Sequence, residues 1–194
     1  MLSFTKLTAL STLAFAAFTS AAPVKVQQRQ LSTVSDILTG LLSDITPVTD
    51  LLNSITASNA TSDVLEPILS QLGDAINPAV SALGDLAGQP ASTILATADG
   101  VLDAAGVASL MSPIISNTYS ALDTVLAVAN DAGVTSAIQP LLNEAGALLN
   151  PLLAATAPLV NGLLAALGPE IAPLLTTIDD LGLGSVLELV ESIL

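Results

Sequence analysis

The spacing of aliphatic residues between Ser32 and Ser58 constrains the fold of this chain more than any other feature. These residues follow one another at intervals of four and three positions. That period corresponds to one face of an α-helix, whereas a half-buried strand would place an apolar residue at every second position. The stripe consists of Val34, Leu38, Leu41, Ile45, Val48, Leu52 and Ile55, and Ile37, Leu42 and Leu51 widen it. The segment is therefore predicted to be an amphipathic helix, with Ser, Thr, Asp and Asn on its other face.

A second helical stripe follows the first, and prolines interrupt both. Pro47 falls inside the first stripe, where we expect a kink or a new helix start with Thr46 as the N-cap. Asn77-Pro78 is expected to divide the second stripe in the same way. The second stripe consists of Leu65, Ile68, Leu69, Leu72, Ile76, Val80, Leu83 and Leu86.

The rest of the chain has no alternating strand pattern of useful length and is dominated by Ala and Leu, which both favour helix. Ser185 to Glu188 forms a capping box before the last predicted helix. We therefore predict an all-α fold over residues 32–194, in which proline-punctuated amphipathic helices form a single bundle or an irregular helical array. The C-terminal half, from about residue 134, is strongly apolar and the first half less so. The later helices are expected at about 92–105, 107–132, 134–167 with breaks, 170–180 and 186–193.

A degenerate repeat runs through the chain. The segment 67–78 (PILSQLGDAINP) resembles 140–151 (PLLNEAGALLNP), and 158–169 is a weaker third copy. In each copy a second proline follows the first by eleven positions, which is about three helical turns. This spacing predicts short helices, each opened by a proline at its first position. The alternative is chance similarity in a chain rich in Leu, Ala and Pro.

The first 21 residues have the layout of a secretory signal peptide. One cation, Lys6, precedes an apolar stretch from Leu7 to Phe18, and small residues follow that stretch. Cleavage is expected after Ala21, with Thr19 at position −3. A transmembrane anchor is the alternative, but the apolar stretch is shorter than the roughly 20 residues that a spanning helix needs.

The composition after residue 21 excludes most kinds of catalysis and binding. Residues 22–31 are expected to be a flexible arm that holds the only two basic residues, Lys25 and Arg29, and Arg29 is a weak site for a second cleavage. With seventeen acidic residues, the mature chain has a formal charge of −15, which argues against nucleic acid as a partner. The chain has no His or Cys, so catalytic triads, thiolate or imidazole zinc sites and disulfides are excluded.

Carboxylates and hydroxyls are the remaining groups for chemistry. Asp179-Asp180 is the only adjacent acidic pair, and its surroundings match neither a catalytic Asp motif nor a calcium loop. The sequence therefore predicts neither an enzyme, nor a cofactor, nor a metal site. We interpret the scattered acidic residues as solvated side chains that keep an apolar chain soluble.

The linker 56–63 contains the one N-glycosylation sequon of the chain, Asn59-Ala60-Thr61. A secreted route and a position in a loop both favour modification. We therefore predict that Asn59 carries a glycan.

No charged residue occurs between Ala145 and Pro169, a length sufficient to cross a bilayer. A transmembrane helix is disfavoured because the stretch contains prolines and has no Lys or Arg beside it. The two other interpretations are a buried hairpin within a helical bundle and an apolar surface that adheres to hydrophobic phases, partner chains or cell wall. The residues that would form such a surface are Leu148, Leu149, Leu152, Leu153, Leu159, Val160, Leu163, Leu164 and Leu167.

The combination of these features resembles small secreted fungal wall and surface proteins. The resemblance is carried by the signal end Ala21-Ala22-Pro23, the Asp-dotted half that begins Val34-Ser-Asp-Ile-Leu, the lack of Cys and the Leu/Ala/Pro-rich second half. This layout is similar to that of the mushroom non-hydrophobin structural proteins of aerial hyphae and attachment, and more distantly to the hydrophobic surface-binding protein A family.

The resemblance implies secretion, residence in the cell wall or extracellular matrix, and a role in hydrophobic coating or attachment of hyphae. The implied partners are hydrophobic surfaces, wall components or further copies of the chain. Two alternatives remain open. One is a secreted helical protein that binds a lipid or sterol, and the other is an effector that acts on a host partner.

Overall fold

The chain divides into two units, Met1–Leu31 and Ser32–Leu194. The computed structural model describes residues 32–181 of the second unit, apart from the side chain of Asp180. The predicted cleavage site at Ala21 and the predicted helix 186–193 with its capping box therefore lie outside the described residues. The prediction of an all-α fold is confirmed. The elements are α2 (Val34–Asn53), α3 (Ser62–Asp85), α4 (Ala91–Ile94), β1 (Ala96–Thr97), β2 (Gly100–Val101), α5 (Ala104–Ala132), α6 (Thr135–Ala147), α7 (Leu149–Thr156), η2 (Ala157–Leu159), α8 (Leu163–Ile171), η3 (Ala172–Leu174) and α9 (Leu175–Asp180).

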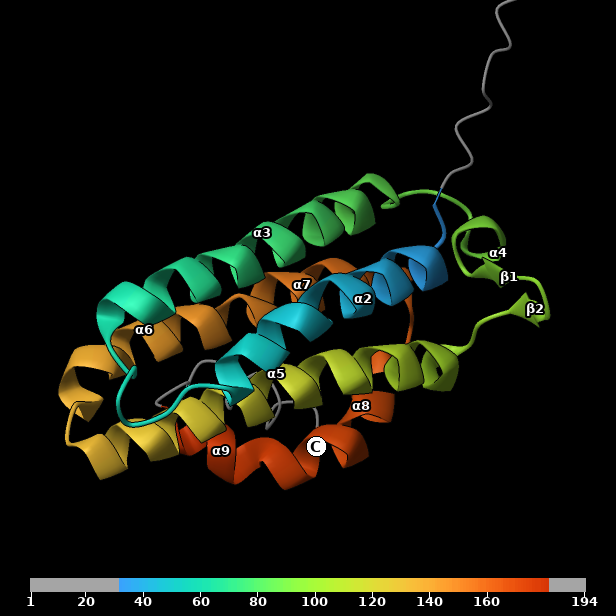
Figure 1. The fold of residues 1–194 in the computed structure, drawn as a ribbon. Coiled ribbons are helices and arrows are strands. Elements are labelled where there is room, and N and C mark those ends of the chain that lie inside the picture. Colours follow the sequence, from blue (N-terminus) through green and yellow to red (C-terminus); the bar gives the residue numbers. More distant parts are fainter. Residues whose placement is uncertain (1–31, 182–194) are drawn as a thin grey trace, which may run out of the picture. The chain divides into compact units, whose positions relative to one another are not determined.

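The long helices form a bundle around an aliphatic core. Helix α2 packs against α3 and α5, α6 packs against α5 and α3, and α7 continues along α3. Helices α8 and α9 also pack against α5. Figure 1 shows that α2 and α5 run in one direction and that α3 and α6 both run in the opposite direction.

Helix α2 forms where the aliphatic spacing predicts it. Its start is fixed by a capping box, in which Asp36 N donates to Thr33 Oγ1 at 3.2 Å and Thr33 N donates to Asp36 Oδ2 at 3.1 Å. All seven residues of the predicted stripe are buried. Leu51, in contrast, is 45% exposed, so the prediction that it widens the stripe is wrong.

Four of the prolines do not divide their helices, which corrects the predictions made from their positions. Helix α2 continues through Pro47, α3 through Pro67 and Pro78, and α6 through Pro140. Thr46 is not an N-cap, because it lies inside α2 and its hydroxyl donates to the Leu42 carbonyl at 2.6 Å.

The cost of an internal proline, about 3 kcal/mol, is offset by the stripe that continues on both sides of it. Burying one Leu, Ile or Val side chain contributes about 1.5–3 kcal/mol, and Ile45, Val48 and Leu52 are all buried around Pro47. Pro47 itself is exposed, so the backbone carbonyl that it leaves without an N–H partner lies on the solvent side. In the predicted repeat, Pro151 and Pro158 lie in the first turn of a helix, whereas Pro169 lies inside α8.

The segment after α3 also differs from the prediction of a helix over 92–105. It forms the single turn α4 and then a two-stranded hairpin, in which Ala96 pairs with Val101 and Thr97 with Gly100. Gly100 has a φ of +140°, a backbone conformation incompatible with a continuous helix. Helix α5 begins only after Asp103, whose carboxylate accepts a hydrogen bond from Gly106 N at 2.8 Å.

The sequence repeat extends over two complete helical hairpins. The offset of 73 positions that pairs Pro67 with Pro140 also pairs α2 with α5 without a gap. We call 34–85 the first hairpin and 104–156 the second hairpin. Paired positions that are buried in both include Val34/Val107, Leu38/Met111, Leu41/Ile114, Leu52/Val125, Leu65/Ile138, Leu69/Leu142, Gly73/Gly146 and Ile76/Leu149.

This agreement between sequence and burial disfavours chance similarity. Because α2 lies beside α5 and α3 lies beside α6, each pair running in one direction, the hairpins stack as successive units of a repeat protein do (Figure 1).

Candidate functional site

The predicted apolar surface lies almost entirely inside the folded domain. Leu149, Leu152, Leu153, Leu159, Val160, Leu163 and Leu167 are buried, whereas Leu148 and Leu164 are half-buried. The prediction that these residues present an apolar face is therefore wrong for this folded state. The physical reason is packing: α7 lies against α3 and α8 lies against α5, so the uncharged stretch contributes to the core. Within residues 32–181, no helix combines the length and the apolar character needed to cross a membrane.

The core is held together by aliphatic contacts with little else between the helices. The three buried polar side chains are Thr49, Thr118 and Thr156, and each hydroxyl donates to a carbonyl of its own helix, at 2.9, 2.8 and 2.7 Å respectively. Residues 32–181 contain no Lys, Arg or His, so no side-chain ion pair can form among them, and the chain has no cysteine. The helices could therefore separate without losing these internal hydrogen bonds.

Three described side-chain hydrogen bonds join α5 to later helices. One of them lies at the turn into α6, where Thr135 Oγ1 donates to Asn130 Oδ1 of α5 at 2.6 Å. Ser112 Oγ donates to Glu170 Oε2 of α8 at 3.2 Å, and the Tyr119 hydroxyl lies 3.5 Å from the Gly146 carbonyl oxygen of α6. Tyr119 is only 1% exposed, and this burial raises the pKa of its phenol well above the ordinary range. It is the only Tyr in the chain, so its absorbance and fluorescence report on this part of the core.

Asn59, the predicted glycosylation site, lies in the turn between α2 and α3. Its side-chain oxygen accepts hydrogen bonds from Thr56 N at 2.7 Å and from Thr56 Oγ1 at 3.1 Å. These bonds use the carbonyl oxygen of the amide and leave its nitrogen, the atom that would carry a glycan, outside them. The loop position agrees with the expectation, and glycosylation itself stays a prediction.

Of the acidic pair at the end of α9, the structure describes the side chain of Asp179, which is exposed. No cluster of three or more His, Cys, Asp or Glu side chains placed to hold a metal ion occurs in the part of the chain that the structure describes.

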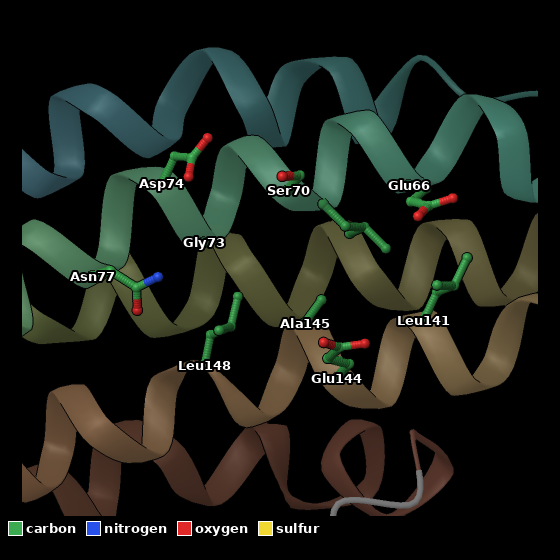
Figure 2. A pocket seen from close by; sticks show the side chains of 10 residues that line it. Glu66, Ser70, Gly73, Asp74, Asn77, Leu141, Glu144, Ala145 and Leu148 are labelled. Carbon is green, nitrogen blue, oxygen red and sulfur yellow. The ribbon is translucent and has the colours of Figure 1, made fainter.

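A groove with a volume of about 360 Å³ lies between α3 and α6 (Figure 2). We call it the α3–α6 groove. Its polar side chains are exposed, whereas Leu141 and Leu148 are half-buried, and Leu69 and Ala145 are buried. A shallower hollow of about 320 Å³ lies between the end of α5 and α6. The residues that line the α3–α6 groove are Glu66, Leu69, Ser70, Gly73, Asp74, Asn77, Leu141, Glu144, Ala145 and Leu148.

Of the residues that line this groove, the sequence singled out Leu148 as part of the apolar surface and Leu69 as part of the second helical stripe. The signal that could have found the groove is the repeat, because its two strongest copies, 67–78 and 140–151, are the segments that lie side by side here. Figure 2 shows them in parallel, with Leu141 near Glu66 and Leu148 near Asn77.

Comparisons with protein-family models, with curated proteins and with solved structures gave no match for this chain.

Proposed function

We propose that this protein is a secreted, surface-active structural protein of the fungal cell wall or extracellular matrix, and that its bundle opens at hydrophobic surfaces and coats them. The observation that carries the proposal is the aliphatic core. Among residues 32–181, no ion pair or disulfide holds the helices around this core together. The apolar face needed for adhesion is then a property of the opened bundle, since the closed bundle buries it.

The energetics of opening support this mechanism. Burial of apolar area contributes roughly 25 cal/mol per Å², whether the area is covered by another helix or by a hydrophobic solid. The apolar face of an amphipathic helix such as α2 can therefore leave its neighbouring helices and bind a hydrophobic solid, while the backbone hydrogen bonds of the helix remain intact. The exposed carboxylates on the opposite helix faces stay in water and keep the coated surface wettable.

The test is adsorption of the purified mature protein to a hydrophobic polymer sheet. We expect a lasting fall in water contact angle after a detergent wash, with helical circular dichroism retained on the sheet. A protein that washes off in buffer, leaving the contact angle unchanged, contradicts the proposal. Lipid recovered from the purified protein by organic solvent would instead favour the lipid-binding alternative.

A cross-link separates opening from simple adhesion. Because the chain has no cysteine, Ser112→Cys/Glu170→Cys introduces the only two thiols, at positions whose native side chains are 3.2 Å apart. A short bifunctional thiol reagent then ties α8 to α5. We expect the linked protein to adsorb at least tenfold more slowly than the same variant capped with a monofunctional reagent. Equal rates would show that opening of these helices is not required.

A further inference from the structure

We propose that the α3–α6 groove is a docking site for a basic amphipathic helix supplied by a partner peptide or protein. This inference concerns the closed bundle, and it goes beyond the proposed coating of hydrophobic surfaces.

Small residues open the floor of the groove. Gly73 has no side chain and Ala145 only a methyl group, so α3 and α6 leave a depression between the half-buried side chains of Leu141 and Leu148 (Figure 2). A Cβ atom at Gly73 would lie 3.7 Å from Leu148 Cδ1, an ordinary contact, so the depression is closed on that side. The floor therefore accepts an aliphatic side chain from outside.

Carboxylates flank this apolar floor. Glu66 and Asp74 come from α3 and Glu144 comes from α6, and all three are exposed. None of them has a cationic neighbour among residues 32–181, because that part of the chain contains no Lys, Arg or His. The charge that complements the groove must therefore come from outside residues 32–181, and it must be positive.

The length of the groove favours a helix as the occupant. Glu66 and Asn77 are eleven residues apart on α3, which corresponds to about 16 Å, or three helical turns. A helix of that length presents aliphatic anchors at positions i, i+3 or i+4, and i+7 along one face. Lys or Arg residues beside these anchors would face Glu66, Asp74 and Glu144. The bundle of a second copy would instead add carboxylates to a groove that already has three.

The experiment uses the mature protein and a synthetic 14-residue helix of Leu and Lys, with the Leu residues on one face. Isothermal titration calorimetry should show saturable 1:1 binding that weakens as salt is added. The isomeric peptide with Glu in place of Lys should not bind. Unchanged Tyr119 fluorescence during the titration would show that the core stays closed.

Two matched pairs of variants locate the site. E66Q/D74N/E144Q removes the three groove carboxylates and should weaken binding at least tenfold, whereas D44N/D50N/D131N removes three exposed carboxylates elsewhere and should weaken it less than threefold. Ser70→Phe fills the groove with a bulky side chain from an exposed position and should also abolish binding. Ser43→Phe, at an exposed position of α2, should not.

Each outcome decides the proposal, provided that circular dichroism shows all variants folded. Selective loss in E66Q/D74N/E144Q and in Ser70→Phe supports docking in the groove. Equal weakening in both charge variants would mean attraction to the net negative charge and would overturn the proposal, as would the absence of saturable binding. Binding accompanied by a change in Tyr119 fluorescence would overturn it as well, because it would indicate opening of the bundle.

Discussion

The two hairpins of this protein share one interior pattern but differ on their outer faces. At the offset of 73 positions, five residues of α5 are buried whose partners on α2 or just after it are not. Four of these five pairs exchange an apolar or aromatic residue for a polar one. The pairs are Ala108/Ser35, Ile115/Leu42, Tyr119/Thr46, Leu126/Asn53 and Ala129/Thr56.

The difference follows from what covers each helix. Helix α5 packs against α2, α6, α8 and α9, whereas α2 packs against α3 and α5. In stacked repeats, a terminal unit needs a polar outer face because no further unit covers it. The first hairpin has that property, and the second hairpin has the apolar surface of an internal unit.

The largest expected change in stability comes from replacing a residue of the second hairpin with the residue at the paired position of the first. Tyr119→Thr removes a buried aromatic ring and should lower the free energy of unfolding by about 3–5 kcal/mol. The reciprocal variant, Thr46→Tyr, changes an exposed position of α2 and should shift it by less than about 0.5 kcal/mol. Urea unfolding followed by circular dichroism measures both. Similar losses of stability in the two variants would refute the idea that the number of helices packed against α2 and α5 explains why their outer faces differ.

Alkaline pH should destabilise the second hairpin through the same residue. Burial raises the pKa of Tyr119, so the folded state holds the phenolic proton more tightly than the unfolded state does. Stability from this source is intact below about pH 10 and is lost as pH rises further, by about 1.4 kcal/mol at pH 11.

Urea midpoints at pH 8 and pH 11 measure this loss, and phenolate absorbance should appear only as the protein unfolds. Tyr119→Phe should remove the tyrosine-linked part of the pH dependence. Phenolate absorbance from the folded protein near pH 10 would contradict the prediction.

The two hairpins begin with different N-caps, which are expected to contribute similarly to the free energy of unfolding. Thr33→Ala breaks the capping box of α2, and Asp103→Ala removes the cap of α5. Each should lower the free energy of unfolding by about 1 kcal/mol, and the double variant should lose the sum because the caps belong to different helices. Thermal or urea unfolding of the three variants checks this, with Ser43→Ala, an exposed helical position, as the neutral reference. A clearly larger loss at one cap would mean that its hairpin governs the stability of the whole domain.

A small effect is expected at Leu51, whose partner in the second hairpin is Thr124. Leu51 is 45% exposed, so Leu51→Thr should change the free energy of unfolding by less than about 0.7 kcal/mol, mostly through helix propensity. Leu52→Thr, at the fully buried neighbouring position, should cost several times more. A large loss of stability for Leu51→Thr in urea unfolding would mean that residues outside the described part of the chain pack against this face of α2.

The sequence by itself determined the helical class and the buried stripe of α2. A four-and-three spacing admits one regular structure, and Val34, Leu38 and Ile45 are buried as their positions predict. The sequence also held the repeat between 67–78 and 140–151. Both are local or periodic properties, which the order of residues states directly.

Tertiary structure alone decided whether each proline interrupts its helix and which helix packs against each apolar face. Pro47 and Pro78 stay inside continuous helices because the aliphatic residues on both sides of them pack into one core. The same cause explains why most Leu and Val side chains of the uncharged stretch 145–169 are buried and why the α3–α6 groove exists. Burial depends on which helix lies opposite, and that neighbour comes from a distant part of the chain.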